Sequence, residues 1–242
     1  MKMTRSVWLA GTLMVGAVGS AAAQVPRVQS DILFGVNVGL QPSARTFELN
    51  ATPLVFGEDA TFHALEGVDG SAMLDLLGGY RLTRNYWVVL GLTTTMFTKS
   101  EAFVTAQIPD PLFYDRRTSA VASLRDLKHV ERSAHLSVMW VTPINRKIDL
   151  AILGGPSYLK VFQDLAQTVN VTSGTRDASP AGEQATATKL GFHIGGDATY
   201  LLTPGIGVGL MVRFVGASAE LASVPSLKLG GLQYGGGLRL RF

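Results

Sequence analysis

The last stretch of the chain, residues 228–242, alternates between apolar side chains and polar side chains or glycines. Side chains alternate between the two faces of a strand but not of a helix, so the segment is predicted to be a β-strand. One face ends in Arg239 and Arg241, and the chain stops at an aromatic residue. The other face is wholly apolar and carries Leu232, Tyr234, Leu238, Leu240 and Phe242.

The same alternation recurs in seven earlier segments, each long enough for a tilted strand to cross a bilayer, which takes ~9–11 residues. These segments are residues 31–41, 71–82, 86–97, 129–142, 147–162, 185–202 and 206–218. Short connections alternate strictly with longer ones along the chain. The short ones are 83–85, 143–146 and 203–205, and the longer ones are about 43–70, 98–128, 163–184 and 219–227. The pattern predicts an all-β fold of eight antiparallel strands connected up and down.

Composition favours a membrane protein that crosses with strands. Apolar residues make up 47% of the 242-residue chain and charged residues 16%. Beyond the amino terminus, no apolar run reaches the ~20 residues that a transmembrane helix needs. A closed barrel is the other structure that leaves no backbone group unpaired in lipid. The chain has no cysteine, which excludes a disulfide framework, a thiolate metal site and a lipoprotein anchor.

Residues 1–23 are predicted to be a cleaved secretory signal peptide. Lys2 and Arg5 form its positive end, a short apolar core follows, and Ala21 to Ala23 supply the small residues before the cut. Removing these two cations brings the net charge of +3 close to neutral. The charge therefore gives no reason to expect nucleic acid as a partner.

The carboxyl-terminal strand, with Phe242 at its end and apolar residues at alternate positions before it, resembles the closing strand of small bacterial outer-membrane β-barrels. The resemblance implies a transmembrane, eight-stranded, porin-like barrel over residues 24–242 in the outer membrane of a Gram-negative cell. It also implies short periplasmic turns, long external loops and recognition of the last strand by the barrel-assembly machinery. A girdle of aromatic side chains is expected beside the short turns and comprises Tyr80, Tyr86, Trp140, Tyr200 and Phe242.

The alternative fold is a soluble secreted barrel of the lipocalin kind, which would turn its apolar face inward. The many glycines on the polar face, the aromatic level and the terminal Phe242 all favour the membrane barrel.

The face opposite the apolar one is expected to line the lumen, where eight strands leave just enough room for side chains. Its predicted polar network comprises Asp75, Arg81, Glu131, His135, Asp149, Lys189, His193, Asp197, Arg213, Arg239 and Arg241. Because both signs of charge are present, we expect these side chains to pair with one another and to close the lumen. A barrel with a closed lumen is expected to have a structural or surface-interaction role. The alternative is a narrow channel for small solutes or hydrophobic compounds, with inward glycines supplying the space. The external segment 107–117 is a candidate to bind a partner or to pack over the barrel mouth.

One pair of residues is a candidate for catalysis. His135 and Ser137 lie two apart on one strand face and resemble the His-x-Ser pair of the outer-membrane lipid A deacylases, in which the histidine is the base for a serine nucleophile. That family's pair must meet lipid, whereas the alternation here turns both residues inward and Leu136 outward. We therefore expect no enzyme activity from them, and no motif predicts a cofactor or a metal.

Two cations break the apolar face. Arg132 and Lys160 occupy outward positions, where a cation at the bilayer midplane would cost about 2–4 kcal/mol. Folding the strands about a turn at residues 143–146 places Arg132 opposite Ser157 and Lys160 opposite His129, near neighbours at the external rim. Both side chains could simply reach water there. We expect them instead to bind a phosphate of lipopolysaccharide, a partner that comes with the outer-membrane lipid.

Overall fold

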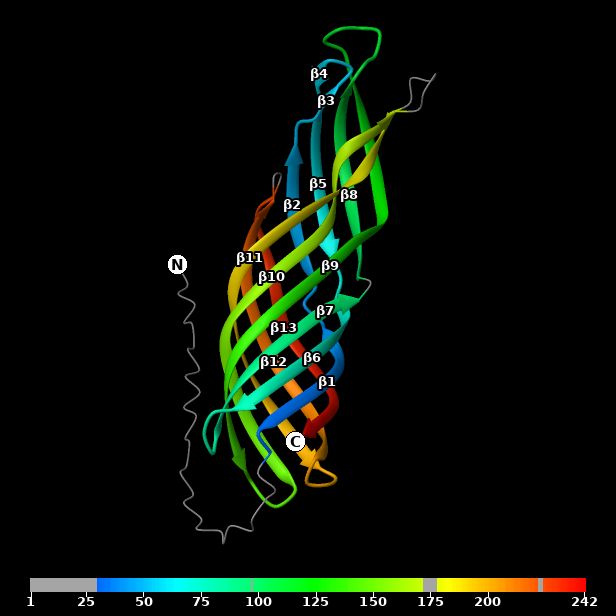
Figure 1. Ribbon diagram of the computed structural model, residues 1–242. Coiled ribbons are helices and arrows are strands. Elements are labelled where there is room, and N and C mark those ends of the chain that lie inside the picture. Colours follow the sequence, from blue (N-terminus) through cyan, green and yellow to red (C-terminus); the bar gives the residue numbers. More distant parts are fainter. Residues whose placement is uncertain (1–29, 97, 172–177, 222–223) are drawn as a thin grey trace, which may run out of the picture.

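The computed structural model describes residues 30–96, 98–171, 178–221 and 224–242 (Figure 1). The predicted signal peptide lies outside these residues and stays a prediction. The strands are β1 (Ile32–Gln41), β2 (Arg45–Ala51), β3 (Leu54–Val55), β4 (Glu58–Asp59), β5 (Thr61–Val68), β6 (Ser71–Arg81), β7 (Tyr86–Met96), β8 (Thr98–Pro109), β9 (Arg117–Pro143), β10 (Ile148–Val171), β11 (Ala178–Leu201), β12 (Ile206–Leu221) and β13 (Val224–Arg241). Among these described residues, no helix is long and apolar enough to span a membrane.

Eight of the described strands close into a ring. They follow one another as β9, β10, β11, β12, β13, β1, β6 and β7, and β7 pairs again with β9. Every pair in this ring is antiparallel. The predicted eight-stranded, up-and-down barrel is therefore confirmed. The ring strands begin and end close to the predicted positions beside the short turns, whereas β9, β10 and β11 extend well past their predicted external ends.

The ends of the described chain meet where the barrel closes. The backbone N–H groups of Asp31 and Ile32 both donate to the carbonyl oxygen of Phe242, at 2.7 and 3.0 Å. The N–H of Phe242 in turn donates to the carbonyl of Ile32 at 3.0 Å. The terminal residue thus completes the pairing of β13 with β1, at the same end of the barrel as the short turns (Figure 1).

The turn between β9 and β10 differs from the predicted one. Pro143 still belongs to β9, and the N–H of Ile144 closes the turn on the carbonyl of Ile148 at 2.9 Å. The turn therefore spans 144–147, and the strands pair three residues away from the predicted register. Arg132 lies directly opposite Lys160, not Ser157, and His129 lies opposite Gln163. The register predicted from sequence was wrong, although it did bring the two cations near each other.

The long external connections are present, and they carry strands of their own. β8, β5 and β2 extend the sheet beyond the ring by pairing in that order on the first half of β9. β10 and β11 continue their pairing well beyond the barrel, with Asp164 opposite Gln184. In Figure 1 these strands rise from the barrel end that lies farthest from the carboxyl terminus. We call the group β2, β5, β8 and the first half of β9 the external layer.

An apolar core holds the external layer against the extensions of the barrel strands. Inward side chains of β5 and β8, such as Phe62 and Val104, share this core with Leu159 and Val161 of β10 and with Leu229 of β13. Burying such side chains contributes roughly 1.5–3 kcal/mol each. The external segments are therefore held by an apolar core that they share with the extensions of the barrel strands.

The outer face of the barrel is apolar. Alternate residues along each ring strand are exposed, for example Leu90, Leu136, Ile152 and Leu210. The five predicted girdle residues are all exposed as well, next to the short turns or at the closure of the barrel, and Tyr86 lies opposite Trp140. A closed ring with this exterior leaves no unpaired strand edge in lipid.

Candidate functional site in the barrel lumen

The centre of the lumen is an ion pair between β12 and β6. The Nη2 of Arg213 lies 2.9 Å from Oδ1 of Asp75, and both side chains are buried. Asp75 also accepts hydrogen bonds from Asn37 at 2.8 Å and from Thr93 at 2.6 Å. The Nε of Arg213 donates to Gln233 at 2.9 Å. Each charge therefore has an opposite charge and further hydrogen bonds, which a buried pair needs to be tolerated.

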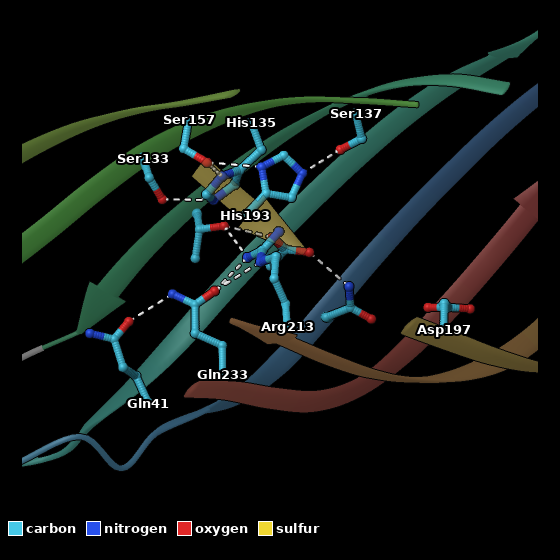
Figure 2. A network of polar contacts seen from close by, with 12 residues as sticks. Gln41, Ser133, His135, Ser137, Ser157, His193, Asp197, Arg213 and Gln233 are labelled. Carbon is cyan, nitrogen blue, oxygen red and sulfur yellow. Dashed lines mark hydrogen bonds and ion pairs between the residues drawn. The ribbon is translucent and has the colours of Figure 1, made fainter. Parts of the chain in front are cut away.

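This pair belongs to a column of polar contacts that follows the lumen. Toward the turns, Asn37 accepts a hydrogen bond from Arg239 at 2.7 Å, and Arg239 forms an ion pair with Asp197. Toward the outside, Gln233 donates to Gln41 at 2.7 Å (Figure 2). Arg241 forms a separate ion pair with Asp149 near the turns.

Glu131 is the hub at the external mouth. Its Oε1 lies 2.8 Å from Nη1 of Arg45 and 3.1 Å from Nε2 of His129. Its Oε2 accepts hydrogen bonds from Gln41 at 3.1 Å and from the backbone N–H of Gly230 at 3.0 Å. Arg45 belongs to β2, so this carboxylate ties the external layer to the barrel mouth.

The two histidines join serines in a second chain of contacts. His135 lies 2.9 Å from Ser133 and 2.8 Å from Ser157, and His193 lies 2.9 Å from Ser157 and 2.8 Å from Ser137 (Figure 2). His135 therefore has both ring nitrogens engaged by serines other than Ser137. All five side chains face the lumen or its wall, and the His135–Ser137 pair has no access to lipid. His135 and Ser137, weighed as a catalytic pair from the sequence, are hydrogen-bonded to other partners and not to each other.

The lumen narrows to apolar packing near the turns. Leu33, Trp87, Val89, Met139 and Ala151 form a buried cluster inside the ring. The cavity beside it holds about 30 Å³, room for only a few water molecules.

The inward glycines do not widen the lumen. A Cβ atom at Gly237 would lie 1.7 Å from the carbonyl oxygen of Val36, and one at Gly209 would lie 2.8 Å from Cζ of Arg239. These glycines let neighbouring strands and the Arg239 guanidinium approach closely. They leave no open volume for the channel alternative at these positions.

Two predicted network members belong neither to the column nor to the other polar contacts described above. Arg81 stacks on Trp87, with 4.8 Å from its guanidinium carbon to the ring centroid, and its Nε has no hydrogen-bond partner. Lys189 lies opposite Leu159, at the level of the external core. Sequence reasoning missed the uncharged members Asn37, Gln41 and Gln233, although their inward positions within alternating strands could have marked them.

Glu66 is a buried carboxyl group of the external layer. It accepts hydrogen bonds from the backbone N–H of Ala166 at 2.7 Å and from Gln163 at 3.3 Å. Burial raises the pKa of Glu66 from its usual value of 4.5 to about 7, and nearby Asp164 adds to the rise, against the lowering effect of the two hydrogen bonds. The carboxyl group links β5 to β10 above the barrel mouth.

The packing of the external layer is expected to depend on pH through Glu66. A folded pKa above the unfolded one makes folding take up a proton, so this stabilisation is complete below about pH 4.5 and is lost as pH rises through about 7. The loss is at most about 3 kcal/mol. The difference in melting temperature between pH 5 and pH 8 should be smaller for Glu66→Gln than for the wild type, because a glutamine side chain has the shape of glutamate and cannot ionise. An equal pH dependence in both proteins would show that Glu66 does not titrate as described.

Among the described residues, no group of three or more histidine, cysteine, aspartate or glutamate side chains is placed to hold a metal ion. The expectation that no cofactor is needed stays a prediction.

No protein-family model matches the chain, and no curated protein matches it. Among solved structures, the outer membrane protein OprG from Pseudomonas aeruginosa matches with a TM-score of 0.49 at 12% identity, over 88% of this chain and 96% of that one. Neisserial surface protein A matches with a TM-score of 0.45 at 11% identity, over 87% and 96%. The outer membrane protein AlkL matches with a TM-score of 0.37 at 17% identity, over 92% and 95%.

Proposed function

We propose that this integral outer-membrane β-barrel works at the cell surface, with a closed lumen and an external layer that contacts a partner outside the cell. Its location in the outer membrane follows from the closed ring, the apolar exterior and the polar interior. The role proposed beyond this location is that of the external layer.

The observation that carries the proposal is the contrast between the lumen and the external layer. The lumen is crossed by the column through Asp75 and Arg213 and is packed with apolar side chains near the turns. The external layer packs on an apolar core that it shares with β10 and β13, whereas a simple set of connecting loops would need no such core. This arrangement supports presentation of a surface more than passage of a solute.

The tip of the external layer is the candidate contact surface. The β3–β4 hairpin meets the β8–β9 connection there, where the backbone N–H of Asp115 donates to the carboxylate of Glu58 at 3.1 Å. Asp110 fixes the β8–β9 connection by accepting hydrogen bonds from the N–H groups of Leu112 and Phe113. Tyr114 is 87% exposed on this ordered connection. The exposed apolar side chains of the tip are Leu54, Phe56, Leu112, Phe113 and Tyr114.

Replacing Leu112, Phe113 and Tyr114 with serine is expected to abolish surface binding without unfolding the protein, because all three side chains are exposed. The measurement uses fluorescent nanodiscs that carry the protein, with binding to intact bacterial and animal cells counted by flow cytometry. The wild type should bind one of these cell types above empty nanodiscs, and the triple variant should fall to the level of empty nanodiscs.

The matched control is Ile144→Ser, which changes an exposed apolar residue of a short turn at the opposite end of the barrel. This variant should bind like the wild type. Binding that is equal in the wild type and the triple variant, or no binding above empty nanodiscs to either cell type, would reject the proposed role of the tip.

A further inference from the structure

A row of four polar side chains crosses the outer face of the barrel above the apolar band. Register places Thr94 of β7 opposite Arg132 of β9, Arg132 opposite Lys160 of β10, and Lys160 opposite Thr188 of β11. Because directly paired residues point to the same side of a sheet, all four side chains share the outer face. The row thus sets two adjacent cations between two hydroxyl groups.

The side chains directly below the row, toward the turns, are apolar. One step nearer the turns, the same strands present Leu92, Ala134, Tyr158 and Leu190, and Leu190 is 77% exposed. One step farther out, Phe162 lies opposite Val130 and opposite the exposed Thr186. The row therefore marks the outer limit of the apolar band, where the first charged side chains appear on the outer face of these strands.

Both cations rest against one aromatic ring. The guanidinium carbon of Arg132 lies 5.4 Å from the centroid of Phe162, and Nζ of Lys160 lies 4.9 Å from it. The face of the ring attracts both cations and so holds two like charges close together. Among the described residues, neither cation forms an ion pair with a carboxylate. The two positive charges thus remain available to an anion from outside the protein.

The row lies at the depth of the outer lipid headgroups. Lys160 is twelve residues beyond Ile148, where β10 begins beside the short turn. At about 3.3 Å per residue and a tilt of about 40°, that distance corresponds to roughly 30 Å along the membrane normal, about the thickness of the hydrocarbon core. The exposed aromatic residues at the turns mark the other interface.

We propose that Arg132 and Lys160, flanked by Thr94 and Thr188, bind a phosphate group of a lipid in the outer leaflet, namely lipopolysaccharide. Two cations can share the charge of one phosphate through charge-assisted hydrogen bonds, and the hydroxyl of Thr188 can donate to one of its remaining oxygens. The hydroxyl of Thr94 donates to the carbonyl oxygen of Thr95 at 3.3 Å. The acyl chains of the same lipid lie against Tyr158, Leu190 and Leu92 below the row. The site thus recognises both parts of one molecule, a charged head above and apolar chains beneath.

The test compares the melting temperature of the refolded protein, read by heat-modifiable gel migration in neutral detergent, with and without lipopolysaccharide. Lipopolysaccharide is expected to raise the melting temperature of the wild type, because a ligand that binds only the folded state stabilises it. The rise should disappear in the double variants Arg132→Ala, Lys160→Ala and Arg132→Gln, Lys160→Gln, whose side chains lie on the surface.

The matched control is the double variant Arg84→Ala, Arg146→Ala, which removes two exposed cations from the short turns at the other end of the barrel. It changes the net charge equally and should keep the full rise. Lipopolysaccharide stripped of its phosphates and inorganic phosphate alone should each fail to stabilise the wild type. An equal rise in the wild type and the Arg132 and Lys160 variants, or equal stabilisation by free phosphate, would overturn the proposal.

Discussion

Replacing Arg213 with alanine is expected to lower the free energy of unfolding by about 3–5 kcal/mol, because it leaves the charge of Asp75 buried without its partner. Asp75 is fully buried and keeps only the hydrogen bonds from Asn37 and Thr93. Gln233 loses its donor in the same step. Heat-modifiable gel migration in detergent should show the unfolding transition of Arg213→Ala at a markedly lower temperature.

Two further variants separate the loss of charge pairing from the loss of a large side chain. Arg125→Ala removes an exposed arginine of the external layer, 3.9 Å from Glu101, and should change stability by no more than about 1 kcal/mol. Adding Asp75→Asn to Arg213→Ala removes the stranded charge and should recover part of the lost stability. If Arg213→Ala is as stable as Arg125→Ala, Arg213 is not part of a buried pair.

Deleting Phe242 is expected to prevent assembly in the cell and to leave unfolded protein in the periplasm. The deletion removes three backbone hydrogen bonds between the two strands that close the barrel, which together contribute roughly 2–4 kcal/mol. It also removes the aromatic terminus that the resemblance to outer-membrane barrels assigns to recognition by the assembly machinery. Protease accessibility on whole cells and fractionation of the periplasm would measure both effects.

Refolding in detergent distinguishes the two contributions of Phe242. Without the assembly machinery, the truncated protein should still fold, with a lower melting temperature that reflects the lost hydrogen bonds. Phe242→Tyr keeps the backbone and an aromatic ring, so it should reach the surface normally. Wild-type surface levels of the truncated protein would contradict the proposed role of the terminal residue.

The barrel itself could be predicted because each of its strands meets two different environments. The strict alternation of residues 228–242, for example, needs only the period of a strand and a contrast between lipid and lumen. The external layer has no such contrast. In β5 the inward side chains include both Glu66 and Phe62, and the outward ones include both Leu65 and His63. Polar and apolar residues therefore do not alternate along this strand. Only tertiary packing against β10 reveals that this segment is a strand.

The sequence predicts which residues face the lumen but not which of them pair with each other. The parity of a residue within its strand put Asp75, Arg213 and Arg239 inside, whereas the pairs depend on register and on strands distant in sequence. Glu131 shows the limit most clearly, because its partner Arg45 lies in a segment expected to be a connecting loop. The pairing of Arg132 with Lys160 required a register three residues away from the expected one, in which Pro143 lies opposite Asp149.

Ion conductance across a planar lipid bilayer tests the proposed closed lumen most directly. The purified barrel, inserted at known density, should produce no discrete openings, because the column through Arg213 and the apolar cluster around Trp87 fill the ring. A large general porin recorded in the same bilayer provides the positive control. Baseline current that stays flat for the wild type is the predicted result, and reproducible unitary current steps from the folded protein would contradict it.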